Sequence, residues 1–150
     1  GNTMVYNQEA HEIITGVQTT SRRVVSHDWW IYLLMTAVDA QIIYDLEPSI
    51  LYRQHKRNAI GSNARIVSRM FRLKQLITGE FGEWISHNMV ALDECQVIFS
   101  NEKNYIVATF QEGRKGQFLQ RFSAMRKSGV RRQSTLDNVA LWIALILKKV

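Results

Sequence analysis

Two residues of this chain could do chemistry: Asp28 and His55. Asp28 stands near the predicted start of a helix, where the hydroxyl of Ser26 can accept a hydrogen bond from a free amide of the first turn. The helix dipole favours a carboxylate at this position and favours its charged form. The alternative is an acidic residue that only stabilises the end of the helix. A lone histidine such as His55 is more often a surface residue or a hydrogen-bonded structural one.

The stretch 26–61 must position both residues. A buried helix is predicted after Ser26, because apolar residues recur there at helical spacing, at Trp30, Leu33, Leu34 and Ala37. Residues 41–44 and 49–52 are short runs with Ile and Tyr, separated by a turn that ends at Pro48. They predict two strand pieces, or a strand and an extended segment. Pro48 has no amide N–H, so the second piece begins there or lies at an edge.

Several groups of residues in this stretch have a familiar order, namely His27-Asp28-Trp29-Trp30, Tyr44-Asp45, Glu47-Pro48 and Ile50-Leu51-Tyr52-Arg53-Gln54-His55. They resemble the second half of bacterial glycosyltransferase family 2 enzymes, and most of all the rhamnosyltransferase-like members that build cell-surface polysaccharides. Residues 1–7 resemble a family segment that reads Gly-Cys-Thr-Met-Val-Phe-Asn. Residues 131–134 and 136–138 resemble a common tail. The resemblance touches the whole chain, but its specific motifs lie in residues 1–7 and 26–61.

The resemblance implies a GT-A fold, whose first half holds the nucleotide and an Asp-x-Asp metal motif. Its second half holds the acceptor and the catalytic base. This chain has no Asp-x-Asp sequence, so we expect the C-terminal part of a longer enzyme. The expected fold is α+β and mainly helical. Residues 1–61 would be the acceptor-side remnant of the GT-A catalytic domain, with short strands, and residues 62–150 a C-terminal helical region.

The resemblance also implies roles for individual residues. Asp28 matches the general base that takes the proton from an acceptor hydroxyl as this hydroxyl attacks and inverts the anomeric carbon. His55 matches a histidine that helps to bind a divalent metal, Mn²⁺ or Mg²⁺, whose other ligands would lie mostly in the missing N-terminal half. Lys56-Arg57-Asn58 stands where relatives have Gly-Asn-Asn, and Asn2 where they have Cys. The substrate-binding residues expected by this likeness are Trp29, Trp30, Thr3, Arg53 and Asn58. Core packing is the alternative for at least one of the two tryptophans.

The implied function is inverting transfer of a sugar from a nucleotide-sugar to a cell-surface polysaccharide or a lipid-linked glycan. Rhamnose is the donor sugar that the resemblance favours. The reaction would take place in the cytoplasm, with the enzyme peripheral at the inner face of the cytoplasmic membrane. The chain would dock on its own missing N-terminal domain and would be inactive alone.

Composition is that of one ordinary domain, with 150 residues of which 46% are apolar. The single cysteine, Cys95, cannot form an internal disulfide and is interpreted as a buried structural thiol. No apolar run reaches the length of about 18 residues or more that a membrane-spanning helix needs.

Glycines and capping residues after Gly61 divide the second part of the chain into helices. We expect helices near residues 63–77, 83–98, 100–113, 117–127 and 136–149, and an earlier one at residues 8–15 that Asn7 could cap. In the helix at 117–127, Phe118, Leu119, Phe122 and Met125 are expected on one face. The last helix is unusually apolar.

The net charge of +6 is unevenly distributed. Seven basic residues and no acidic one lie between Glu47 and Glu80, and the same holds between Glu112 and Asp137. These runs are either solvated helix faces or contacts with an anionic membrane surface, with Phe118, Phe122, Trp142 and the last helix in the interface. The last helix could instead pack on the other helices or on the missing half.

The main alternative function is a basic helical module that binds nucleic acid, or docks on a protein, without catalysis. No zinc spacing or RNA-binding-sheet motif supports nucleic-acid binding, so nucleic acid is not an expected partner.

Overall fold

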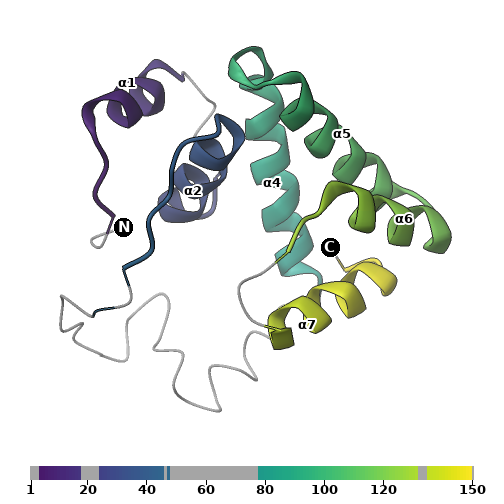
Figure 1. The fold of residues 1–150 in the computed structure, drawn as a ribbon. Helices are drawn as coiled ribbons and strands as arrows, with labels where there is room; N and C mark the ends of the chain where they lie inside the picture. The colour runs from purple at the N-terminus through teal and green to yellow at the C-terminus, as the bar shows by residue number, and fades with distance from the viewer. Residues whose placement is uncertain (1–3, 18–23, 46, 48–77, 132–134, 150) are drawn as a thin grey trace.

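The structure is a computed structural model that describes residues 4–17, 24–45, 47, 78–131 and 135–149, and the fold is given for these alone. Within them the chain is mainly helical (Figure 1). The helices are α1 (Gln8–Gly16), α2 (His27–Ala37), α4 (Glu80–Glu94), the short 3-10 helix η2 (Gln96–Ile98), α5 (Asn101–Lys115), α6 (Phe118–Ser128) and α7 (Thr135–Ile146). No described helix is both long enough and apolar enough to cross a membrane.

The predicted α+β class, with short strands from a GT-A half, is wrong, because none of the described residues forms a β-strand. Residues 4–6 and 41–44 are irregular, and all of them except the half-buried Met4 are exposed, with Val5 at 99% and Ile43 at 82%. A short apolar run becomes a strand only when a neighbouring strand completes its backbone hydrogen bonds, and the described part of the chain offers neither run such a neighbour. The strand expected at 49–52, the helix expected at 63–77 and the boundary expected between residues 61 and 62 lie outside the described residues.

Several helix ends follow the signals in the sequence. The Asn7 side chain caps α1 by accepting a hydrogen bond of 3.0 Å from the amide of Ala10, and Ser100 caps α5 through the amide of Lys103 at 3.3 Å. Gly129 ends α6 with a φ of 64°, a left-handed conformation that glycine adopts without strain. Ser26 occupies the N-cap position of α2, but its side chain makes no capping hydrogen bond.

The first core cluster fixes α2 against α4 and η2. Its buried residues are Trp30, Leu34, Met35, Ala37, Ala91, Leu92, Cys95 and Phe99. Ala10, Ile13 and Ile14 of α1 pack on this cluster from the other side of α2. Burial of a single large apolar side chain contributes about 1.5–3 kcal/mol, so this cluster holds the start of α2 in a defined place.

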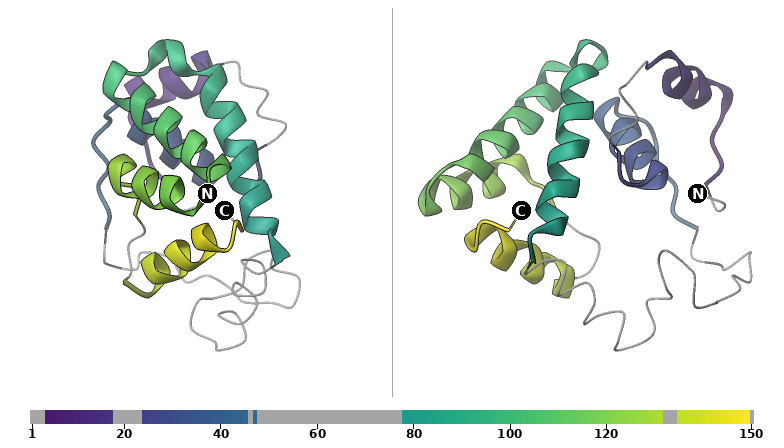
Figure 2. Two further views of the ribbon diagram at one scale, coloured as in Figure 1. Left: turned by 90° about the vertical axis from the view of Figure 1, so that its right-hand side faces the viewer. Right: turned by 180° about the vertical axis from the view of Figure 1, so that it is seen from behind.

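The second core cluster joins α4 to α5, α6 and α7, and Figure 2 shows these helices gathered on one side of the molecule. Its buried residues are Ile85, Phe110, Met125, Leu141, Ala144 and Leu145. Met89 of α4 packs against both clusters. Asn88, one turn after Ile85, is completely buried, and its amide has no hydrogen-bond partner among the described residues.

Helices α5 and α6 approach closely where Gly113 faces Ala124. A Cβ atom added to Gly113 would lie 2.1 Å from the Cβ of Ala124. The face of α6 that points inward is formed by Arg121, Ala124, Met125 and Ser128. Of the four residues expected on one face of this helix, Phe118, Leu119, Phe122 and Met125, only Met125 is buried, and Leu119 is 76% exposed.

Arg121 ties α6 to the end of α7. This arginine is 6% exposed, and its guanidinium donates hydrogen bonds to the carbonyls of Leu145 at 2.7 Å and Ile146 at 3.0 Å. Carbonyls in the last turn of a helix have no partner within the helix, and a cation at this end also complements the helix dipole. The side chain therefore supplies a C-terminal cap from a neighbouring helix.

The close approach of α5 and α6 can be tested with a matched pair of glycine substitutions. Gly113→Ala is expected to lower the free energy of unfolding by about 1–3 kcal/mol, because the new methyl group overlaps Ala124. Gly16→Ala, at the end of α1 where nothing lies within 4 Å, is expected to be neutral or to stabilise by up to about 1 kcal/mol. Urea unfolding followed by circular dichroism measures both. Equal effects of the two changes would contradict the packing.

Replacing Arg121 tests the cap on α7. Arg121→Met is expected to lower the free energy of unfolding by about 2 kcal/mol, because two carbonyls lose a charged donor. Amide hydrogen exchange should accelerate in the last turn of α7. The exposed Arg126 on the same helix is the control, and Arg126→Met should change stability by less than about 0.5 kcal/mol. Unchanged exchange in α7 would show that the cap contributes nothing.

Candidate functional site

The candidate site centres on Asp28 in the first turn of α2. Its side chain is 46% exposed, and the Nε2 atom of His27 lies 2.6 Å from its Oδ1 atom. Two residues further on, Trp30 is buried in the first core cluster. The core therefore anchors the helix, while the carboxylate at the helix start remains accessible to solvent.

The electrostatic environment keeps Asp28 charged. The pKa of this carboxyl is lowered from its usual value. Partial burial acts in the opposite direction, and the neighbouring His27 lowers the pKa further. The N-terminal end of the helix dipole favours the same charged form. An ionised, partly exposed carboxylate can accept a proton from a hydroxyl group.

The two tryptophans after Asp28 both take part in packing. Trp30 is 6% exposed and lies in the first cluster. Trp29 is half-buried and stacks on Phe81 of α4, with ring centroids 5.7 Å apart and an angle of 9° between the rings. This stack joins the start of α2 to the start of α4. It leaves part of the Trp29 side chain at the surface, close in sequence to the candidate base.

The other predicted site residues lie outside the described residues: Thr3, Arg53, His55 and Asn58. The structure therefore brings together Asp28, Trp29 and Trp30 and places none of the others. Among the described residues, no three His, Cys, Asp or Glu side chains are close enough together to hold a metal ion. The described part of the chain does not fit a metal site by itself.

His27 is a site residue that the sequence reasoning did not select. Its contact with Asp28 joins neighbours in the sequence at the first turn of a helix. The adjacent order His-Asp at a predicted helix start was the available signal. Neighbours in a regular helix point in different directions, so helical spacing alone gave no reason to pair them.

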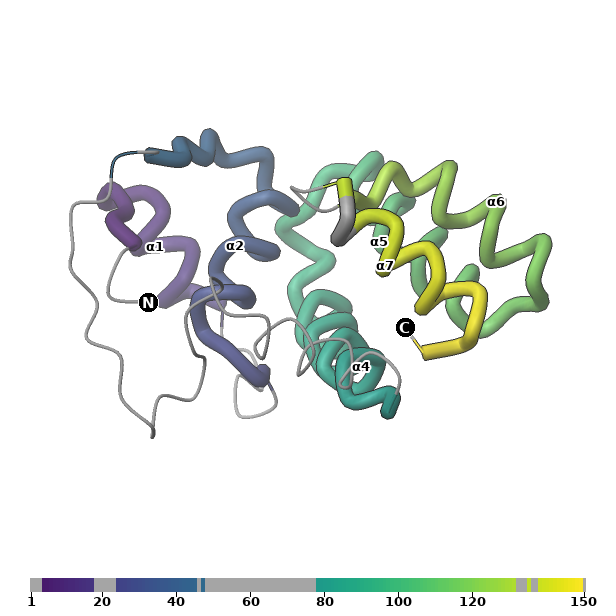
Figure 3. Tube along the Cα trace, turned by 90° about the horizontal axis from the view of Figure 1, so that it is seen from below, coloured from purple at the N-terminus to yellow at the C-terminus, as the bar shows by residue number. Residues whose placement is uncertain are grey.

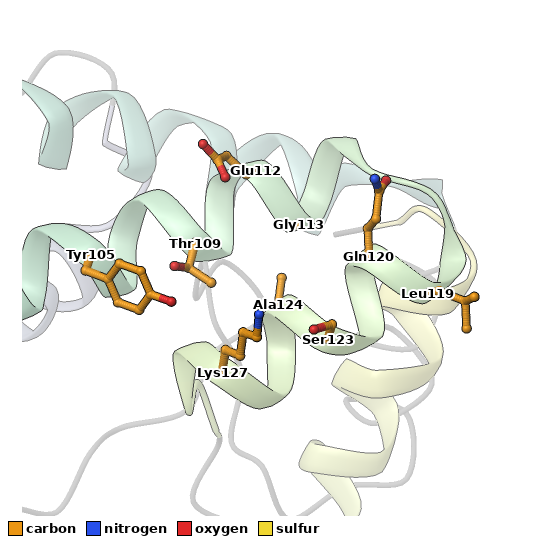
Figure 4. Close-up of a pocket in the computed structure, with 9 residues that line it drawn as sticks. All are labelled: Tyr105, Thr109, Glu112, Gly113, Leu119, Gln120, Ser123, Ala124 and Lys127. Atoms are coloured by element: carbon orange, nitrogen blue, oxygen red, sulfur yellow. The ribbon is translucent and has the colours of Figure 1, made fainter.

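A groove lies between α5 and α6 (Figure 4). It has a volume of about 530 Å³, with Tyr105 at one end and Leu119 at the other. Its lining is mixed, and the charged members are Glu112 and Lys127. The remaining lining residues are Thr109, Gly113, Gln120, Ser123 and Ala124. No residue of the α2 site contributes to it, and no site prediction from the sequence falls in it.

Cys95 is not a nucleophile. The thiol is buried in the first cluster and donates a hydrogen bond to the carbonyl of Ala91 at 3.2 Å. Burial, with a smaller contribution from Glu94, raises its pKa to about 11. Since the thiolate is the reactive form, the interpretation of Cys95 as a buried structural thiol is confirmed.

No protein-family model, curated protein or solved structure matches this chain. The site is therefore defined by its own geometry and by the sequence motif around Asp28.

The burial of Cys95 predicts slow alkylation. At pH 8 the folded thiol should react with iodoacetamide on the order of a hundredfold more slowly than in guanidinium chloride, since a pKa of about 11 leaves little thiolate. The fold favours the protonated thiol, so the free energy of unfolding should fall as pH rises from 9.0 to about 11. Mass spectrometry measures the rate, and a Cys95→Ala variant should lose that part of the pH dependence. Equal rates in native and denaturing buffer would refute the burial.

Proposed function

We propose that this chain is the acceptor-side part of an inverting glycosyltransferase and that Asp28 is its general base. The observation that carries the proposal is the Asp28 carboxylate itself. It is charged, partly exposed and held at the start of a helix whose next turn is fixed in the core. The motif His27-Asp28-Trp29-Trp30 supports the same assignment through its resemblance to glycosyltransferase family 2 enzymes.

In the proposed reaction, Asp28 accepts the proton of an acceptor hydroxyl. The oxygen of that hydroxyl forms a bond to the anomeric carbon of the donor sugar, and the bond from this carbon to the nucleoside diphosphate breaks. The diphosphate leaves with the electron pair, and the configuration at the anomeric carbon inverts. A base is effective only within hydrogen-bond reach of the proton it removes, which the fixed start of α2 allows.

The proposed donor is a nucleotide-sugar, with rhamnose favoured, and the acceptor a cell-surface polysaccharide or a lipid-linked glycan in the cytoplasm. The donor, and a divalent metal such as Mn²⁺ or Mg²⁺, would be bound mainly by a domain outside this chain, with His55 as the contribution of this chain. A metal would stabilise negative charge on the leaving diphosphate. No step is assigned to it here, because the described residues do not form a metal site.

Exposed apolar residues in the segments that flank α1 and α2 support contact with a further domain. Val5, Ile43 and Tyr44 are 99%, 82% and 71% exposed and lie in the irregular segments on either side of α1 and α2. Large exposed apolar side chains that gather in one region often mark an interface. We propose that the donor-binding domain of the complete enzyme covers them.

Substitution of Asp28 in the complete enzyme tests the proposal. Asp28→Asn should lower turnover by about 10²–10⁴-fold, because the amide cannot accept the hydroxyl proton. The measurement is release of nucleoside diphosphate from a panel of nucleotide-sugars, with Mn²⁺ or Mg²⁺ and membrane lipid extract as the acceptor source. Circular dichroism should show an unchanged fold.

Glu9→Gln is the matched control, because Glu9 also lies in the first turn of a helix and has no assigned task. Its turnover should equal that of the wild type. Full activity of Asp28→Asn would refute the base, and no release from any donor would count against the glycosyltransferase proposal as a whole.

A further inference from the structure

Helices α6 and α7 expose a set of large apolar side chains. We call it the α6–α7 patch, and its members are Phe118, Phe122, Val139, Ile143, Ile146 and Leu147. Each of them is between 42% and 57% exposed. Single exposed apolar residues are common on protein surfaces, but a contiguous group marks a surface that contacts something apolar.

The patch is continuous across the two helices. The ring of Phe122 on α6 lies 5.0 Å from the ring of Trp142 on α7, measured between centroids. Along α7, Val139, Ile143 and Ile146 follow at spacings of four and three, so they lie on one face. Figure 3, drawn from below, shows α7 in front of α5.

The outer face of α7 is not part of the second core cluster. Leu141, Ala144 and Leu145 fill the second cluster from the opposite side of the helix, and each is at most 4% exposed. Arg121 caps the end of the helix from the protein side. The helix is therefore fully attached to the fold while its apolar outer face remains uncovered.

Basic residues border the patch. Arg126 follows Phe122 by one turn and is exposed. Lys148 and Lys149 come directly after α7, where their backbone amides donate to the carbonyls of Leu145 and Ala144 at 3.2 and 2.8 Å. These hydrogen bonds hold the two lysines at the C-terminal end of the α6–α7 patch. The sequence from Arg114 to Arg132 contains no acidic residue.

We propose that the α6–α7 patch docks on an anionic membrane surface. The apolar side chains would enter the boundary between headgroups and acyl chains, and Arg126, Lys148 and Lys149 would contact the anionic headgroups. The charge argues for this occupant, because the patch has cations at its border and the chain has a net charge of +6. A nucleic acid could pair with the basic residues, but it would not cover the apolar side chains of the α6–α7 patch. The 12 residues of α7 give a length of about 18 Å, which suits a helix that lies on a bilayer.

This inference does not depend on the glycosyltransferase proposal, because it uses none of the residues of the α2 site. It can therefore stand if Asp28 proves to have no catalytic role, and it can fail while the catalytic assignment holds.

Vesicle co-sedimentation of this chain tests the proposal. The wild type should sediment with vesicles of phosphatidylcholine and phosphatidylglycerol and remain in solution with phosphatidylcholine alone. Ile143→Ser/Ile146→Ser should weaken partitioning by at least about 30-fold, because two half-exposed side chains no longer enter the lipid. Lys148→Gln/Lys149→Gln should weaken it about tenfold or more.

Val97→Ser/Ile98→Ser is the matched control. It also removes two exposed aliphatic side chains, but from η2 instead of the patch, so its binding should equal that of the wild type. Circular dichroism checks the folding of each variant. A shift of tryptophan emission to shorter wavelength when the wild type meets anionic vesicles gives a readout that needs no variant, since Trp142 adjoins the patch.

Five results would overturn the proposal. Absence of wild-type binding to anionic vesicles would do so, and so would equal binding to both vesicle types or equal loss in the η2 control. The fourth is dimerisation in sedimentation equilibrium that Ile143→Ser/Ile146→Ser abolishes while vesicle binding persists, which would assign the patch to a second copy of the chain. Salt-sensitive retention on DNA without vesicle binding would likewise assign the basic border to nucleic acid.

Discussion

Helix α4 is the element on which the described fold depends. Its first half contributes to the cluster with α5, α6 and α7, its second half to the cluster with α2, and Met89 contacts both. Polar bonds reinforce the side toward α5. Arg114 donates to the carbonyl of Gly82 and to the hydroxyl of Ser86, both at 2.9 Å, and Gln111 donates to Asp93 at 2.9 Å. The pKa of Arg114 is lowered by its partial burial. The candidate base on α2 and the apolar surface on α7 are therefore positioned by one helix.

The approach of α5 to α6 explains the unusual surface of α6. Two backbones can come this close only where small residues meet, and Gly113 and Ala124 are small. The inward face of α6 then has little space for rings, so Phe118 and Phe122 point outward. Arg121 occupies the inward face instead and uses its long side chain to reach the end of α7. The packing that ties three helices together thus also creates the exposed aromatic surface.

Capping residues close in the sequence predicted the helix ends. Features that depend on distant parts of the chain, such as strand pairing, could not be predicted from local sequence. Asn7, Ser100 and Gly129 act within one or two turns, and the helix ends they predict are observed. The strand predicted at 41–44 failed because a strand is completed by partners elsewhere in the chain. Apolar spacing on α6 did not specify burial, because only Met125 of the four apolar residues expected on one face lies in the core. For the site, the cap pattern placed Asp28 correctly at the start of α2, but the contact of His27 depends on a side-chain rotamer that spacing does not specify.

The buried amide of Asn88 has a consequence for how the molecule opens. It lies on α4 between Ile85 of one cluster and Ala91 of the other, and it has no hydrogen-bond partner among the described residues. Burying such a group without a hydrogen bond costs about 1–3 kcal/mol. This cost is removed when water reaches the side chain and forms hydrogen bonds with its amide. Thermal fluctuations that separate the two clusters are therefore favoured at this point along α4. We expect the cluster with α2 and the cluster with α5, α6 and α7 to open as separate cooperative units.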